Sequence, residues 1–241
     1  MKRFPTLLLP TLLTAVFLTL GATPVRAQTT LSLTGGVSLA SLNTDFDGAL
    51  APDIESITGM SVGLAATIPV TDRFGVQLGG RYVQKGGSLD LLGMMMEMFG
   101  RSEGMEQVTS FETDFRMDYV EFSALARVRF PLSGDRMSGH LLAGPALGLQ
   151  SSCEVGVRIR EPGFPEADVN MDCEEFGPIF KGKLDLGLAG GAGIDIGLTD
   201  SIDARLGLLY TLGLSNVVDD DDETMKHRAL TIRTGVAIPV G

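Results

Sequence analysis

The chain of 241 residues contains no tryptophan, only two cysteines and two histidines, and more acidic than basic residues, with a formal net charge of −11. This acidic balance argues against nucleic-acid binding, which depends on clustered lysine and arginine. Two cysteines without clustered histidines make a poor structural zinc site, because a closed site takes four ligands. After residue 27 no stretch of 18 residues is continuously apolar, which excludes a helical membrane protein.

The N-terminus has the three parts of a secretory signal. Lys2 and Arg3 supply the positive start, and residues 7–20 are mostly apolar. The alternative is a transmembrane anchor, but the apolar run is about 14 residues, shorter than the roughly 20 that a spanning helix needs. We therefore expect residues 1–27 to be a signal peptide and residues 28–241 to form the exported domain.

The exported part shows a period-two alternation of apolar residues with small or polar ones, in eight successive segments. The clearest segment places Leu184, Leu186 and Leu188 on one face and Asp185 and Gly187 on the other. This pattern is typical of an up-and-down β-barrel in a membrane. We expect an all-β fold, an eight-stranded antiparallel up-and-down transmembrane β-barrel. Its short connectors are expected at 69–73, 131–137 and 199–201, and its long ones at 43–55, 86–114, 151–178 and around 219–223.

The length of the connectors predicts the orientation of the barrel. Short connectors face the periplasm and long ones the cell exterior in barrels of the bacterial outer membrane. A soluble sandwich or a lipocalin-type barrel would instead turn the apolar face inward. The polar face here is rich in glycine, alanine and serine, which suits a narrow lumen better than a solvated surface. The low aromatic content, 6 %, is unusual for a membrane barrel, which normally carries interfacial aromatic residues.

Eight strands enclose only enough room for side chains. Buried charges are costly unless they are paired, so the inward charges should form a hydrogen-bonded network. Across the turn near Asp200, Asp195 lies almost opposite Arg205 and should pair with it. An ion path is the alternative to a packed polar plug, and we favour the plug. The expected network comprises Arg81, Glu121, Arg127, Asp185, Asp195, Arg205 and Arg233, and Lys85, Arg129 and Asp203 share its face.

Cys153 and Cys173 fall in the same long connector. Export would place them in an oxidising compartment, where a disulfide is favoured over free thiols. Closing a loop of about 20 residues contributes on the order of 3 kcal/mol in the chain-entropy model. We therefore expect the disulfide Cys153–Cys173.

Three other motifs have both a functional and a structural interpretation. The acidic run 219–223 could bind calcium or share divalent cations with lipopolysaccharide phosphates, but it lacks EF-hand spacing, and we favour a solvated loop. The methionine-rich stretch 91–99 could contact a partner or pack on itself. The glycines of 191–193 lack the third glycine of a dinucleotide-binding motif and fit lumenal clearance. The weak candidate metal ligands are Asp219, Asp220, Asp221, Asp222 and Glu223.

Some small outer-membrane barrels are enzymes, so catalytic residues need consideration. Acyl transfer or hydrolysis needs a nucleophile or activated water, a base and an orienting group at one site. Only His140 and His227 are available as histidines, and they should lie at opposite ends of the barrel. His227 beside the acidic run is the sole candidate base, and we favour its interpretation as a rim histidine. We expect no enzyme activity and no cofactor.

Several motifs resemble the PorT-like outer-membrane β-barrel family. The matching stretches are 118–122, 143–145, 184–187 with 191–193, and 210–216. The resemblance implies a barrel with a structural, adhesion or secretion-associated role exerted through extracellular loops, and no catalytic residues. We expect as partners outer-membrane lipid and lipopolysaccharide, the barrel-assembly machinery during insertion and a protein at the extracellular loops, and no nucleic acid.

Overall fold

The structure is a computed structural model that describes residues 28–44, 54–90, 110–132, 134, 136–160, 163, 167–176, 184–216 and 224–240. The predicted signal peptide, the methionine-rich stretch 91–99 and the acidic run 219–223 lie outside the described residues. No helix among the described residues is long and apolar enough to span a membrane.

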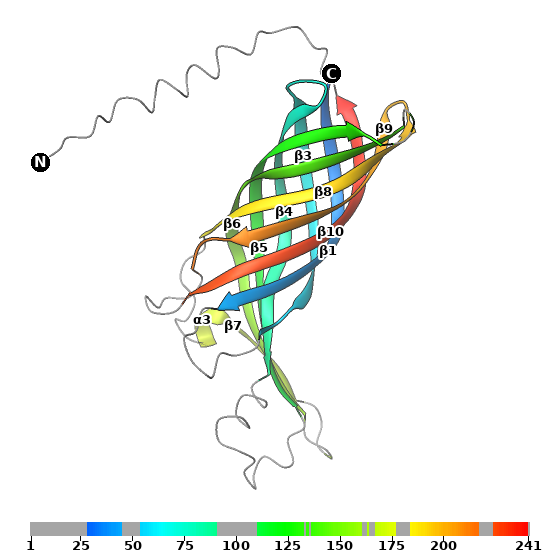
Figure 1. Ribbon diagram of the computed structural model, residues 1–241. Coiled ribbons are helices and arrows are strands. Elements are labelled where there is room, and N and C mark those ends of the chain that lie inside the picture. The colour runs from blue at the N-terminus through cyan, green and yellow to red at the C-terminus, as the bar shows by residue number, and fades with distance from the viewer. Residues whose placement is uncertain are drawn as a thin grey trace, which may run out of the picture.

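Eight antiparallel strands form a closed ring, because the first strand pairs with the last (Figure 1). Neighbouring strands in the ring follow the chain in the order β1-β3-β4-β5-β6-β8-β9-β10, and the predicted up-and-down fold is confirmed. A two-residue strand, β2, extends β3 along β4, and β7 pairs with β6 outside the ring. The elements are β1 (Thr29–Thr44), β2 (Ile54–Glu55), β3 (Ile57–Pro69), β4 (Phe74–Asp90), β5 (Ser110–Pro131), β6 (Met137–Arg160), β7 (Ala167–Asp172), α3 (Cys173–Phe176), β8 (Leu184–Thr199), β9 (Ile202–Gly213) and β10 (Met225–Val240).

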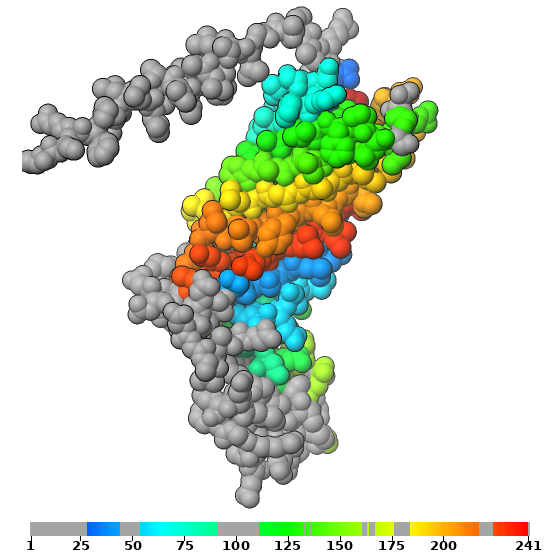
Figure 2. All heavy atoms as spheres, viewed as in Figure 1, coloured from blue at the N-terminus to red at the C-terminus, as the bar shows by residue number. Residues whose placement is uncertain are grey.

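The alternation in sequence separates an apolar outer wall from a mixed lumen. On β9, Leu206, Leu208 and Tyr210 are 42–50 % exposed, whereas Arg205 and Thr211, which flank this row, are buried. The outer side chains of β8, β9, β10 and β1 form a continuous wall (Figure 2). A soluble barrel would have the reverse arrangement, so this wall fits contact with lipid.

The first residue of β1 and the last residue of β10 lie beside the short turns. Thr29 pairs with Val240, and the β3–β4, β5–β6 and β8–β9 turns lie at the same end of the barrel (Figure 1). The first turn is fixed by Thr71, whose Oγ1 accepts a hydrogen bond of 3.0 Å from the amide of Phe74. We call this end the turn end and the opposite end the far end. Because short turns face the periplasm, the far end is expected at the cell exterior.

Strands β4, β5 and β6 extend well into the predicted connectors 86–114 and 151–178. The prediction therefore made these two connectors too long and the strands too short. β5 has 22 residues and β6 has 24, against 12 in β9. At a rise of about 3.3 Å per residue this is roughly 70–80 Å of strand against roughly 40 Å. The far ends of these strands, with β7, form a projecting sheet that we call the blade: residues 84–90, 110–118, 152–160 and 167–172.

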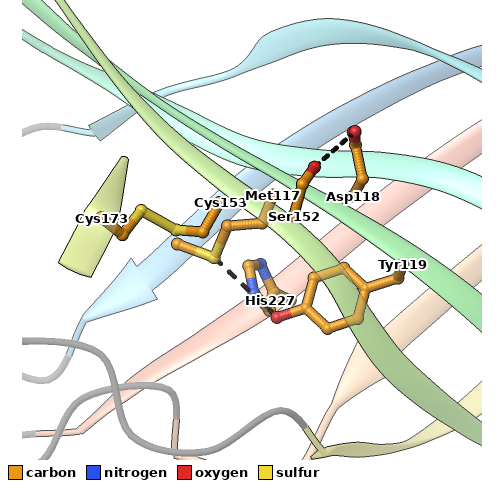
Figure 3. Close-up of a disulfide and its surroundings, with 7 residues drawn as sticks. All are labelled: Met117, Asp118, Tyr119, Ser152, Cys153, Cys173 and His227. Carbon is orange, nitrogen blue, oxygen red and sulfur yellow. Dashed lines mark hydrogen bonds between the residues drawn. A yellow bond between two sulfur atoms is a disulfide. The ribbon is translucent and has the colours of Figure 1, made fainter. Parts of the chain in front are cut away.

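A β-bulge marks the base of the blade. Tyr119 pairs with Gln150 and Asp118 with Ser152, so Ser151 is an extra residue in β6. The hydroxyl of Ser151 donates to the carbonyl of Asp118 at 3.1 Å. The hydroxyl of Ser152 donates to the carboxylate of Asp118 at 2.8 Å (Figure 3). Because one extra residue exchanges the two faces of a strand, Cys153 is turned toward the interior.

Candidate functional site

The middle of the lumen contains a chain of alternating charges from three strands. Arg81 on β4 lies 2.6 Å from Glu121 on β5, and the Nζ of Lys85 lies 3.1 Å from the other oxygen of Glu121. Lys85 then reaches Asp185 on β8 at 2.9 Å. These side chains are at most 11 % exposed, so each carboxylate is neutralised by a cation rather than by solvent.

Arg81 also crosses the barrel. Its Nη1 donates to the hydroxyl of Thr231 on β10 at 3.1 Å, and its Nη2 donates to the hydroxyl of Thr211 on β9 at 2.7 Å. The rigid fork of a guanidinium group suits several acceptors at once. One side chain therefore links strands on opposite sides of the lumen.

A second cluster lies closer to the turn end, around Asp195. Arg205 Nε donates to its Oδ1 at 2.7 Å, as the register of β8 and β9 requires. Arg127 donates to Oδ2, and the Nδ1 of His140 lies 3.1 Å from the same oxygen. The Asp195–Arg205 pair was predicted because it spans one turn. Arg127 and His140 were missed as partners of Asp195 because they come from β5 and β6, far away in sequence.

A third cluster closes the lumen toward the far end. Tyr119 OH lies 3.0 Å from His227 Nε2 and 3.8 Å from Met117 Sδ (Figure 3). Lys85 lies over the Tyr119 ring, 4.9 Å from its centroid. His227 lies near the far end of β10 but is only 1 % exposed, so it is a buried lumenal residue and not one of the solvent-facing rim.

The disulfide lies next to this third cluster. Cys153 and Cys173 are joined with a Cα–Cα distance of 5.4 Å, which confirms the predicted pairing. Cys153 packs against Met117 and Tyr119, and Cys173 begins the short helix α3. The disulfide therefore links the segment after β7 to the cluster of buried side chains at the far end of the lumen (Figure 3).

One side of the lumen is apolar, which the sequence analysis did not predict. Its residues come from β5, β6, β8 and β9. They occupy inward positions, where the predicted polar plug required charged or polar side chains. The cluster consists of Leu125, Leu142, Ala146, Ala189 and Leu209. The sequence contained the information needed to predict this apolar side. The inward leucines occupy the same alternate positions along their strands as the inward charges, so they belong to the same face.

Three expected lumenal residues lie apart from the ion pairs. Arg129 is exposed at the turn end, where its Nε donates to Ser138 at 2.9 Å. Asp203 lines a cavity of about 120 Å³ at the same mouth. Arg233 points inward from β10 but forms no ion pair within the described part of the chain.

Residues 26–219 match the family model described as outer membrane protein beta-barrel domain. The chain belongs to this family. It is an all-β antiparallel barrel, and its location is the bacterial outer membrane. The match establishes the outer membrane protein beta-barrel domain family. It does not establish the PorT-like family, which is a more specific assignment.

Several solved outer-membrane barrels are similar to this family member at low identity. Neisserial surface protein A shares 16 % identity, with 87 % of this chain and 97 % of that chain covered and a TM-score of 0.44. OprG from Pseudomonas aeruginosa shares 14 % identity, with 89 % and 97 % covered and a TM-score of 0.48. Ail from Yersinia pestis shares 15 % identity, with 88 % and 99 % covered and a TM-score of 0.36. No curated protein matches the chain.

The geometry of this outer-membrane barrel offers little for catalysis. His140 and Asp195 form a pair that could orient a base, but the other edge of the imidazole faces Gly193. A Cβ at Gly193 would lie 2.8 Å from His140 Nε2, so that position can carry neither a nucleophile nor a larger side chain. Among the described residues, no group of three or more histidine, cysteine, aspartate or glutamate side chains could hold a metal ion.

Proposed function

We propose that this outer-membrane barrel is a surface-attachment protein, which holds the blade away from the membrane to contact a protein partner while the lumen stays closed. The observation that carries the proposal is the continuation of β5 and β6 as paired strands beyond the apolar wall. A hydrogen-bonded sheet holds its side chains in fixed positions, which suits recognition of a partner.

The outer row of β5 changes character at the base of the blade. Toward the turn end the outward side chains are apolar, as at Val120 and Phe122, which are 37 % and 50 % exposed. Toward the far end the row becomes Asp118, Arg116 and Asp114. Because charged side chains on a lipid-facing surface are destabilising, this change supports a blade that stands in water.

The outer face of the blade presents charges of both signs. Arg158 lies 3.3 Å from Glu112 and 3.6 Å from Asp114, with the side chains 18–38 % exposed. Mixed charges at fixed positions favour a partner with the complementary pattern. A cavity of about 130 Å³ on this face is lined by Asp114, Arg116, Glu154, Gly156, Arg158, Asp168 and Asn170.

The narrower kinship with PorT-like barrels belongs to the same proposal. Its support is the pair of motifs at 118–122 and 210–216, the first of which lies at the base of the blade. Some members of that family are implicated in protein secretion, so a protein of a secretion apparatus is one partner that fits the blade. A barrel of the outer membrane lies among lipid and lipopolysaccharide, and we propose that the barrel-assembly machinery inserts it.

The experiment is photo-crosslinking in intact cells. A photoreactive residue replaces Glu154, which is exposed on the outer face of the blade, and, as a control, Leu208 on the lipid-facing wall. We expect a discrete protein adduct at position 154 and lipid adducts at position 208. Arg116→Glu should reduce the adduct at 154 several-fold, whereas Arg228→Glu, an exposed arginine on β10, should leave it unchanged. Absence of a protein adduct at 154, with the barrel correctly inserted, would contradict the proposal.

Neither a pore nor a lipid-modifying enzyme gains a supporting observation from the described residues. The lumen is crossed by Arg81 and closed further along by Tyr119 and His227. We therefore expect no steady openings in planar bilayers, and no lipid hydrolysis that is lost in His227→Ala.

A further inference from the structure

Arg233 differs from the other lumenal arginines in having no counterion among the described residues. Its Nε and Nη2 atoms are buried and donate to no acceptor. The guanidinium groups of Arg81, Arg205 and Arg127 repel it, while the attracting carboxylate, Asp195, is already paired with Arg127 and Arg205. Leaving a buried charge without a partner is strongly destabilising, so this position calls for a compensating negative charge.

A cavity of about 30 Å³ lies beside Arg233 inside the lumen. A cavity holds a water-sized species when it offers roughly 10–15 Å³, so there is room for a single small species. Three arginines line the cavity, and none of its lining residues is aspartate or glutamate. The lining comprises Ser32, Thr34, Gly63, Leu64, Ala65, Gln77, Gly79, Gly80, Arg81, Ser123, Arg205, Leu209 and Arg233.

The balance of charge in the lumen supports the same conclusion. Away from the mouth, the inward side chains include five cations, Arg81, Lys85, Arg127, Arg205 and Arg233, but three carboxylates, Glu121, Asp185 and Asp195. The carboxylates are all engaged in ion pairs with the first four cations. The inward side chains therefore carry an excess of two positive charges. One is shared within the ion pairs of the first four cations, and the other is located at Arg233, on the wall of the cavity.

Other donors converge on the same space. Gln77 lines the same cavity, and its side-chain oxygen accepts a hydrogen bond from Arg127. The NH₂ group of Gln77 and the Nε and Nη2 atoms of Arg233 are donors, which suit an anion and offer no acceptor to a cation. Arg205 lines both this cavity and the larger one at the turn end, so the two cavities are neighbours.

We propose that this cavity binds one monatomic inorganic anion, chloride under ordinary salt conditions, between Arg233 and the neighbouring arginines. The bound anion completes the lumenal network by neutralising Arg233. A ligand that binds only the folded state raises the folding equilibrium constant in proportion to its concentration above its Kd. The site should therefore make the stability of the barrel depend on chloride.

The test is equilibrium urea unfolding of the protein refolded in detergent micelles, with chloride replaced stepwise by gluconate at constant ionic strength. Gluconate is too large for the cavity, so the comparison separates binding from general salt effects. For the unaltered protein we expect the folding equilibrium constant to rise up to about tenfold per tenfold rise in chloride above its Kd. Arg233→Gln should abolish the dependence. Arg228→Gln, which removes the same charge from an exposed position on the same strand, should retain it.

Equal stability in chloride and gluconate for the unaltered protein would overturn the proposal, as would a chloride dependence that survives Arg233→Gln. Because Arg233→Gln could fail to fold, a second measurement uses the unaltered protein alone. Crystals grown in sodium bromide should show an anomalous peak within hydrogen-bond distance of Arg233. A water-sized density without anomalous signal would assign the cavity to water and contradict the anion.

Discussion

Strands β5 and β6 each pass through two regions, the ring and the blade, and these regions use charge in opposite ways. In the ring, charges point inward, as at Glu121, which is 1 % exposed between two cations. In the blade, charges point outward, as at Glu112, whose side chain is 38 % exposed beside Arg158. The same pleat thus supports a dry network in one region and a solvated surface in the other.

The difference teaches that the medium around the strand decides which face carries charge. The ring faces lipid, where a charged outer row is destabilising, so charges are confined to the lumen and must be paired. The blade has no such constraint. The transition lies at Asp118, where Ser151 bulges and Gln84 Nε2 donates to the carboxylate at 3.2 Å.

The largest expected effect breaks the ring's network while leaving its shape intact. Glu121→Gln removes the carboxylate shared by Arg81 and Lys85 and leaves two cations close together in a buried place. We expect a loss of about 3–5 kcal/mol in the free energy of unfolding, measured by urea titration in lipid vesicles.

The matched change in the blade is Glu112→Gln. Its partner Arg158 is 3.3 Å away and partly exposed, and it has Asp114 as a second partner. Exposed pairs contribute about 0–1 kcal/mol, so the unfolding free energy should change by less than that. Equal losses for the two variants would show that the ring and the blade do not differ in solvation.

The next effect concerns the outer wall. Leu208→Arg places a charge on a side chain that is 47 % exposed on the outside of β9. An arginine facing lipid near the midplane costs about 2–4 kcal/mol, and we expect that loss in the same titration. Asn170→Arg on the exposed strand β7 should change stability within about 0.5 kcal/mol, since it remains in water. A tolerated arginine at position 208 would contradict a lipid-facing wall.

Much of the ring could be predicted from sequence because its signal is local. Alternation gives the face of each residue, and a tight turn gives the register of the next strand, which is why Asp195 could be matched to Arg205. The blade was missed because its alternation is reversed. Its charged row faces outward and its apolar row faces inward, as at Met117 and Val155, which is the opposite of the pattern that marks a strand in a membrane.

The contacts across the lumen could not be predicted for a different reason. Arg81 reaches Thr211 and Thr231 only because the ring closes, and closure sets which inward side chains meet from opposite walls. The pairing of Arg127 and His140 with Asp195 likewise depends on the stagger between β5, β6 and β8. Alternation carries no information about stagger across several strands.

The smallest expected effect on the ring comes from the disulfide, and it sharpens the distinction between the two regions. Replacing Cys153 and Cys173 together by alanine frees the segment after β7 from β6. The ring is closed by strand pairing that does not involve this bond, because β6 pairs directly with β8 from Met137 to Leu149. We therefore expect the unfolding free energy of the ring to fall by less than about 1 kcal/mol, well under the roughly 3 kcal/mol that loop closure alone would suggest. The blade should instead become several-fold more sensitive to brief proteolysis, with cleavage confined to residues 152–176. A large loss in ring stability would mean that the blade and the ring unfold as one unit.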